Sequence, residues 1–322
     1  MESKYPIQPL DFDGISTYPI ESRKSKVDAS MFAKAMDGSE NVLGFIAKLP
    51  HILAADQLRT LIRAILFARA SQKPIVWGIG GHVIKVGLGP VINDLMAHGF
   101  VTGIAMNGSA AIHDFEVAFR GATSEGVEEQ IDSGRFGMAR ETGEFMNAAI
   151  NSAAQHRIGM GECLGQFIRR NEPPFHHAPS SILAEAYSLG IPVSVHVAIG
   201  TDIIHIHPAA SGSNLGEATY RDFRLLCAMT RDLNGGGVYL NVGSAVILPE
   251  VFLKAVSVVR NLGQELEEFT TANLDFIQHY RPTQNVLKRP TQNSGQSVAL
   301  TGHHEIMVPL IAAALKGSLA GK

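Results

Sequence analysis

Short apolar runs that end in glycine or asparagine alternate with amphipathic stretches along most of this chain. The first run, K-P-I-V-W-G-I-G at 73–80, starts at a proline and stops at glycines, a pattern typical of a buried parallel strand. The next, V-T-G-I-A-M-N at 101–107, leads through Gly108 into A-A-I-H-D-F-E-V-A-F, with Ser109 as the expected helix N-cap. Three more strands are predicted at 191–199, 237–242 and 266–273.

Helical periodicity fills the intervals between these runs. Apolar residues recur every three or four positions from 41 to 72, which predicts an amphipathic helix. Further helices are expected at 86–98, 139–170, 180–189, 216–230, 249–261 and 303–315. Strands that alternate with helices predict an α/β fold, with a doubly wound, mainly parallel sheet flanked by helices.

The domain organisation is expected to be simple. Residues 1–30 lack periodicity and are rich in Pro, Ser and charge, so we expect an arm that wraps the domain or a neighbouring subunit. Residues 31–322 form one α/β domain in this interpretation, with a helical and loop insertion at about 120–180.

The composition excludes several classes of function. A net charge of −3 gives no basic face for nucleic acid, and no apolar stretch is long enough for a membrane span. Two cysteines cannot form a disulfide framework, and the N-terminus shows no signal-peptide hydrophobic region. We therefore expect a cytoplasmic protein that binds neither nucleic acid nor membrane.

Small and polar residues follow nearly every predicted strand. In parallel α/β sheets ligands bind beyond the carboxyl ends of the strands, where glycine lets the backbone approach a ligand and helix N-termini offer free N–H groups. The pattern therefore predicts a dinucleotide or phosphate site. The usual G-x-G-x-x-G spacing is missing, because Val83 occupies the last glycine position. The residues concerned are Gly78 to His82, Asn107 to Ser109, Gly200 to Asp202, Asn241 to Ser244, and Thr271 to Asn273.

The stretch G-T-D-I-I-H-I-H-P at 200–208 allows a different interpretation. If the stretch is extended, His205 and His207 point to the same face. Asp202 points to the other face in an ideal strand, but a turn at Gly200 and Thr201 could reorient it as a third metal ligand. No second ligand pair at helical spacing supports zinc, so we expect no metal site. A metal-dependent hydrolase using these three residues remains the alternative.

Three further side chains are candidates for acid–base chemistry. His113 and Asp114 either make structural hydrogen bonds or contact the ribose or the substrate. His303, directly after Gly302, either lines a cleft as an acid or base or belongs to an ordinary helix start.

Several motifs in order resemble the deoxyhypusine synthase family from about residue 73 to 316. They are W-G-I-G-G-H-V-I-K-V-G-L, D-L-M-A-H-G-F-V-T-G-I-A-M-N-G-S-A-A-I-H-D, L-G-I-P-V-S-V-H-V-A-I-G-T-D, F-R-L-L-C-A-M-T-R-D-L-N-G-G-G-V-Y-L-N-V-G-S-A-V, T-T-A-N and T-G-H-H-E-I-M-V-P-L. The segment N-G-S-A-A-I-H-D-F-E is more similar still to the related NAD-dependent ornithine cyclodeaminase-type domains. The resemblance implies a deoxyhypusine synthase-like, NAD-binding fold.

The resemblance also implies site residues. Asp202 and His303 would line the same cleft, and the strand-end position of Ser244 adds it to the cofactor set. The residues expected to contact NAD are Gly80, Gly81, His82, Asn107, Gly108, Ser109, Gly243, Thr271 and Ala272.

Two departures argue against a true deoxyhypusine synthase. Ile112, His113 and Asp114 stand where the synthase has consecutive carboxylates, and Trp77 lies in the first strand rather than beside a catalytic lysine. Lys288 lies near the expected lysine position but out of register with it. An imine-forming lysine must be desolvated enough to be partly neutral.

These observations predict an NAD-binding enzyme that acts on a small amine or amino acid. Hydride abstraction from a carbon bearing nitrogen would give an imine, with His113, Asp114, His303 and Lys288 as candidate catalytic residues. The alternatives are the metal-dependent hydrolase and a non-catalytic NAD-binding protein. Family members assemble as oligomers, so a homodimer or homotetramer is expected.

Overall fold

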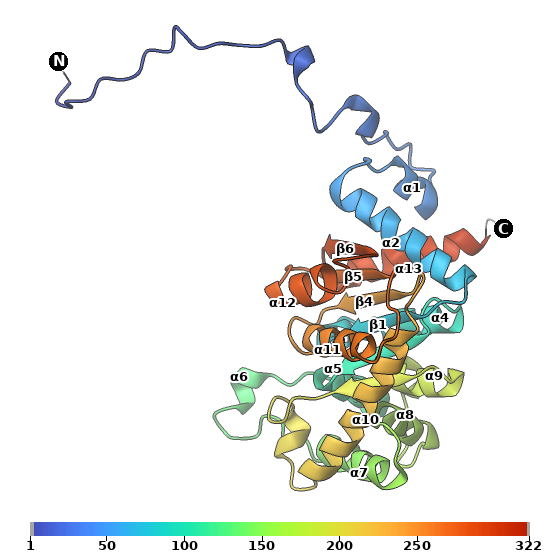
Figure 1. Ribbon diagram of the computed structural model, residues 1–322. Coiled ribbons are helices and arrows are strands. Elements are labelled where there is room, and N and C mark those ends of the chain that lie inside the picture. The colour runs from blue at the N-terminus through green and yellow to red at the C-terminus, as the bar shows by residue number, and fades with distance from the viewer. Residues whose placement is uncertain (1–2, 321–322) are drawn as a thin grey trace.

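The computed structural model describes residues 3–320, and its centre is an all-parallel sheet of six strands within that range. The strands lie in the order β3-β2-β1-β4-β5-β6 (Figure 1). The predicted doubly wound parallel α/β architecture is confirmed. The strands are β1 (Ile75–Ile79), β2 (Gly103–Asn107), β3 (Val193–His196), β4 (Val238–Val242), β5 (Thr270–Asp275) and β6 (Gln296–Thr301).

The central strands are apolar on both faces because helices cover both. Trp77 pairs in register with Ile104 of β2 and Leu240 of β4, and all three face one hydrophobic cluster. The neighbouring Val76 and Tyr239 face the other cluster, because successive side chains of a strand point to opposite faces. The continuous apolar runs of the sequence reflect this two-sided burial.

Two helical layers enclose the sheet. One layer contributes α2 (Leu53–Ala70), α4 (Gly89–Ala97), α5 (Gly108–Arg120), α9 (Ile182–Leu189) and α13 (His304–Ala320) to the first cluster. The other layer consists of α10 (Gly212–Arg231), α11 (Ile247–Asn261) and the π-helical segment η5 (Thr283–Lys288). Short helices α3 (Gly81–Lys85), α6 (Val127–Gln130) and α12 (Tyr280–Pro282) follow strands or lie in loops. Within residues 3–320 no helix is long and apolar enough to cross a membrane.

Helices α7 (Arg140–His156) and α8 (Met160–Arg170) extend the body beyond the β3 edge (Figure 1). Asp222 of α10 anchors α8, because its Oδ2 accepts hydrogen bonds from the N–H groups of Gly161 (2.9 Å) and Val195 (2.8 Å). The Asp222 side chain is fully buried, and this burial raises its pKa to about 7.

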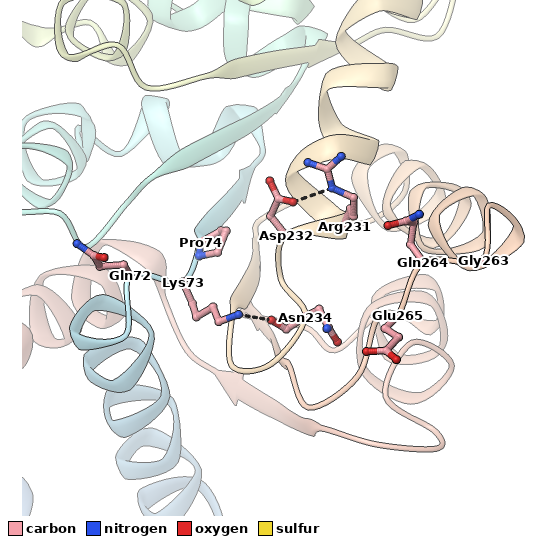
Figure 2. Close-up of a pocket in the computed structure, with 9 residues that line it drawn as sticks. All are labelled: Gln72, Lys73, Pro74, Arg231, Asp232, Asn234, Gly263, Gln264 and Glu265. Atoms are coloured by element: carbon pink, nitrogen blue, oxygen red, sulfur yellow. Dashed lines mark hydrogen bonds and ion pairs between the residues drawn. The ribbon is translucent and has the colours of Figure 1, made fainter.

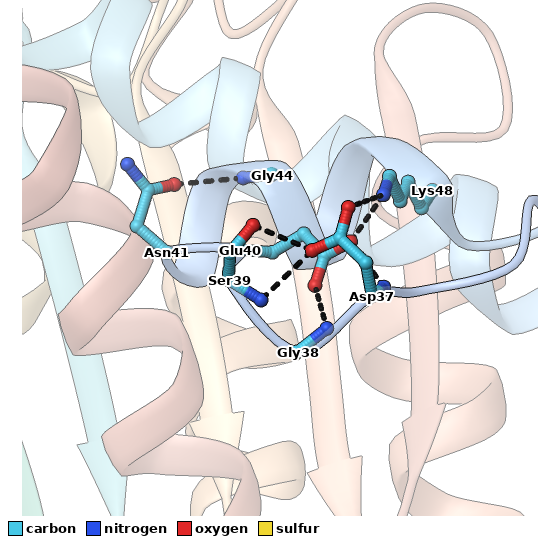
Figure 3. Close-up of polar contacts among 7 residues, drawn as sticks. All are labelled: Asp37, Gly38, Ser39, Glu40, Asn41, Gly44 and Lys48. Carbon is cyan, nitrogen blue, oxygen red and sulfur yellow. Dashed lines mark hydrogen bonds and ion pairs between the residues drawn. The ribbon is translucent and has the colours of Figure 1, made fainter.

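The N-terminal segment joins the body through a compact turn before α1 (Val42–Lys48). Figure 3 shows Asn41 capping α1, with its Oδ1 2.9 Å from the N–H of Gly44, and Lys48 pairing with Glu40. Upstream of Met31 the chain runs away from the body with its large apolar side chains exposed, Phe12 and Tyr18 among them (Figure 1). The division into an arm at 1–30 and a single domain stays a prediction.

Several element boundaries differ from those expected from the sequence. The helix expected over 41–72 is divided into α1 and α2 around Pro50, and the helix over 139–170 is divided at Arg157, which adopts a left-handed φ of 56°. The expected strand at 266–273 begins later, at Thr270. The edge strand β6 was not predicted, because exposed residues interrupt its apolar pattern.

We predict that D222N reduces the dependence of the unfolding free energy on pH. The folded-state pKa of Asp222 lies above the unfolded value, so its proton stabilises the fold at low pH, and this contribution is lost as pH rises through about 7. Between about pH 4 and pH 7 the wild type should lose up to about 4 kcal/mol relative to D222N. Urea unfolding across this range measures the difference. The control D132N, at an exposed position, should show the same dependence of the unfolding free energy on pH as the wild type. If the unfolding free energies of D222N and wild type changed with pH in the same way, the prediction would be wrong.

Candidate functional site

The topological switch point of the sheet lies between β1 and β4. The chain leaves β1 toward α4 in one helical layer and leaves β4 toward α11 in the other. In open α/β sheets this divergence creates the crevice in which ligands bind, outside the carboxyl ends of the strands. The loops that begin with Gly80 and Gly243 flank this position.

The two loops approach each other too closely for side chains. An ideal Cβ on Gly80 would lie 2.1 Å from the carbonyl oxygen of Gly243, and the N–H of Gly80 donates to the carbonyl of Val242 (2.9 Å). Gly243 has a left-handed φ of 70°, which disfavours other residues. Packing between the strand ends therefore already requires these two glycines.

We predict that G80A destabilises the fold by about 2 kcal/mol or more, since the added methyl meets backbone atoms that cannot rotate away. Denaturant unfolding measures the loss. G216A is the matched control: Gly216 lies inside α10 with open space around it, so alanine should be neutral or stabilise by about 0.5–1 kcal/mol. Equal stability of G80A and wild type would overturn this packing argument.

The start of α5 lies beside the same crevice. Asn107 caps the helix, its Oδ1 accepting from the N–H of Ala110 (2.9 Å), so the N-cap is Asn107 and not Ser109 as expected. An ideal Cβ on Gly108 would lie 2.2 Å from the Asp202 carboxylate, and one on Gly81 would lie 2.2 Å from the Ser109 hydroxyl. The loops after β1, β2 and β3 thus bring predicted site residues into contact beside the crevice.

His113 extends this cluster along α5. Its ring carbon Cδ2 would lie 3.0 Å from a Cβ on Gly81, while its Nδ1 lies 2.7 Å from the Thr123 hydroxyl. That hydroxyl donates to Glu116, so it must accept from Nδ1, and Nε2 of the neutral ring is the free basic nitrogen. Thr142 donates to the same carboxylate (3.0 Å). This arrangement suits a base whose positive charge is stabilised by Glu116.

Glu116 is ionised more readily than an ordinary buried glutamate. Burial opposes its ionisation, but the nearby His113 ring and the hydrogen bonds from Thr123 and Thr142 together hold its pKa below the usual value. A cavity of about 370 Å³ opens beside Glu116 and Thr123. The polar contacts from His113 through Thr123 to Glu116 therefore end beside this cavity.

Asp114, the next candidate, points elsewhere. Its carboxylate accepts from the Ser181 hydroxyl (2.6 Å) and from the N–H groups of Ile182 (2.8 Å) and Leu183 (3.1 Å), at the start of α9. The side chain is buried, and burial raises its pKa to about 6. These contacts describe a helix cap, and the catalytic role of Asp114 stays an untested prediction.

The segment D-I-I-H-I-H is a 3₁₀ helix (Ile203–Ile206) and not an extended strand end. His205 Nδ1 accepts from the N–H of Gly200 (3.1 Å), while His207 packs against Gly143 of α7. Burial raises the pKa of Asp202 and lowers that of His205. Among residues 3–320 no group of three His, Cys, Asp or Glu side chains is placed to hold a metal ion.

Aromatic rings gather where β5 and β6 end. The rings of Phe276 and His303 are parallel within 8° with centroids 6.4 Å apart, and His82 lies 6.1 Å from Phe276 and 5.5 Å from His304. His304 Nε2 lies 3.1 Å from the carbonyl of Leu274, which also accepts from the N–H of Gly243. His82 and His303 were predicted from the sequence as site residues, whereas Phe276 and His304 were not assigned to the site.

Other predicted residues lie away from this edge. Thr271 and Ala272 are fully buried in the first half of β5, because the strand starts and ends later than expected. Ser244 is buried and its hydroxyl accepts from the N–H of Leu248 (3.2 Å). Lys288 is exposed at the end of η5, two residues before Pro290, whose carbonyl contacts Arg260 near the amino edge of the sheet.

A polar hollow of about 750 Å³ lies at that opposite, amino edge (Figure 2). Lys73 Nζ donates to the carbonyl of Asn234 (2.8 Å), and Arg231 pairs with Asp232 (2.7 Å), so both cations are engaged. Ligands of parallel α/β sheets bind at the other edge. Residues of this hollow are therefore suitable control positions for mutational tests of the site at the carboxyl edge.

The fold and its switch point define a doubly wound, all-parallel α/β sheet. No protein-family model matches the sequence, and no curated protein is similar enough to count as a match.

Solved structures are similar to this chain in fold. AgrE in ternary complex with ornithine and NAD⁺ has a TM-score of 0.54 at 12% identity, covering 85% of this chain and 35% of AgrE. A LOR/SDH protein from Methanococcus maripaludis S2 has a TM-score of 0.53 at 15% identity, covering 83% and 71%. A protein of Entamoeba histolytica assigned to deoxyhypusine synthase has a TM-score of 0.53 at 11% identity, covering 88% and 96%.

These similarities establish the deoxyhypusine synthase-like fold. This chain spans about a third of the length of AgrE, so the activity of that longer protein does not pass to it with the fold.

Proposed function

We propose that this chain binds NAD across the carboxyl edge of its sheet and acts on a small amine or amino acid. The observation that carries the proposal is the switch point between β1 and β4, flanked by the close glycines Gly80 and Gly243. The fold shared with AgrE, whose structure contains ornithine and NAD⁺, supports the same cofactor and substrate class.

The residues at this edge fit a dinucleotide. Because a carbonyl can only accept, His304 donates from Nε2 to Leu274, which leaves Nδ1 as an acceptor. This Nδ1 is buried and has no hydrogen-bond partner in the described part of the chain. A polar ligand would satisfy it. Gly81, Ser109 and Asp202 would supply further contacts on the β2 side.

When bound, NAD⁺ would supply the hydride acceptor for oxidation at the carbon that bears the substrate nitrogen. His113 takes the proton from that nitrogen through Nε2, which leaves the substrate as an imine. Glu116, linked through Thr123, stabilises the imidazolium. Hydride and proton together account for the two electrons and two hydrogens that the substrate loses.

We predict that the protein binds NAD⁺ in calorimetry and that D202N weakens this binding about tenfold, as expected for loss of one hydrogen bond to a charged group. The matched control is D232N at the amino edge, which should bind NAD⁺ as the wild type does. Stoichiometric zinc without NAD⁺ binding would instead support the hydrolase alternative and overturn the proposal.

We predict that H113Q lowers amine or amino-acid oxidation about 100-fold or more while NAD⁺ affinity is retained. Glutamine fills similar space but cannot take up a proton at neutral pH. Absorbance of NADH at saturating substrate measures the rate, and calorimetry measures the affinity. NAD⁺ binding without turnover of any amine by the wild type would support a non-catalytic NAD-binding protein.

A further inference from the structure

The rings of Phe276 and His303 form an open slot at the end of the sheet that β5 and β6 occupy. Phe276 directly follows β5, and His303 follows β6 after Gly302. Their rings are parallel within 8°, with centroids 6.4 Å apart. Phe276 is 48% exposed and the His303 side chain 67% exposed, so both rings are open to a ligand.

The spacing of the rings suits a third, planar ring. Stacking against both faces requires about 7 Å between the two ring planes, twice the ~3.5 Å contact distance between carbon atoms. The planes are separated by at most the 6.4 Å between the centroids, so the rings must open by at least about 0.6 Å to admit a heterocycle. Both side chains lie at the surface, where such a movement meets little resistance. Offset or face-to-face stacking of this kind is the arrangement that aromatic rings favour.

The position of the slot distinguishes the two ends of a dinucleotide. In doubly wound folds the pyrophosphate lies at the turn after β1, and the adenosine ribose lies near the end of β2. The other nucleoside must then lie over β4, β5 and β6, where Phe276 and His303 stand. The unpaired acceptor of His304 lies at this end of the edge, beside Gly243.

We propose that Phe276 and His303 bind the nicotinamide ring of NAD⁺ between them. The inference rests on the proposed function and specifies which residues hold the reactive end of the cofactor. The oxidised nicotinamide ring carries a positive charge, and the face of Phe276 attracts cations as well as planar rings. The slot therefore favours NAD⁺ in the state that accepts hydride.

Calorimetry with NAD⁺ and ADP-ribose tests the slot. ADP-ribose retains the adenosine and both phosphates but lacks nicotinamide. F276A should weaken NAD⁺ binding about tenfold, the scale of losing a stacking partner, and leave ADP-ribose affinity unchanged. F276L, which keeps apolar area but removes the ring, should also weaken NAD⁺ selectively.

I277A is the matched control, because Ile277 is a neighbouring, equally exposed apolar residue. It should bind both ligands as the wild type does, and circular dichroism checks that every variant is folded. Equal loss of NAD⁺ and ADP-ribose affinity in F276A would place adenine in the slot and overturn the inference. Unchanged NAD⁺ binding in F276A would also overturn it while leaving the proposed function standing. A wild type that binds neither ligand would defeat the proposed function itself.

Discussion

The contact between the ends of β1 and β4 is the constraint on which the carboxyl edge of the sheet depends. Gly80 donates to Val242, and Gly243 in turn donates to Leu274, which also accepts from His304 at the start of α13. Hydrogen bonds therefore run from β1 through β4 and β5 to the last helix. This edge is held rigidly at the point where the chain diverges to the two helical layers, which is where a ligand crevice forms.

Two buried carboxylates each hold the first turn of a helix. Asp114 caps α9 and Asp222 binds the first turn of α8, and each satisfies backbone N–H groups that would otherwise be buried without partners. His113 and Asp114 are adjacent in sequence yet serve different regions, because successive residues of a helix point about 100° apart. His113 consequently faces Gly81 and Thr123, while Asp114 faces away toward α9.

Much of the fold could be predicted from the sequence, and less of the candidate site. Apolar runs that end at glycine or asparagine located five strands, but β6 has a half-exposed edge pattern that does not stand out. β5 ends at Asp275 and not at Asn273 as predicted, so Phe276 follows the strand while Thr271 and Ala272 lie inside it. Local periodicity locates elements better than their boundaries. Phe276 was consequently missed, and His304 was not assigned to the site although its neighbour His303 was.

The sequence by itself determined that the sheet is parallel and covered on both faces, because short strands without an alternating polar face alternate with amphipathic helices. Strand order was decided by the tertiary structure, since hydrogen bonds between distant strands leave no local periodicity in the sequence. That order brings Gly80 against Gly243 and His303 beside Phe276. Only the tertiary structure also showed that D-I-I-H-I-H contains a 3₁₀ helix, with Asp202 against Gly108 and His207 packed on α7.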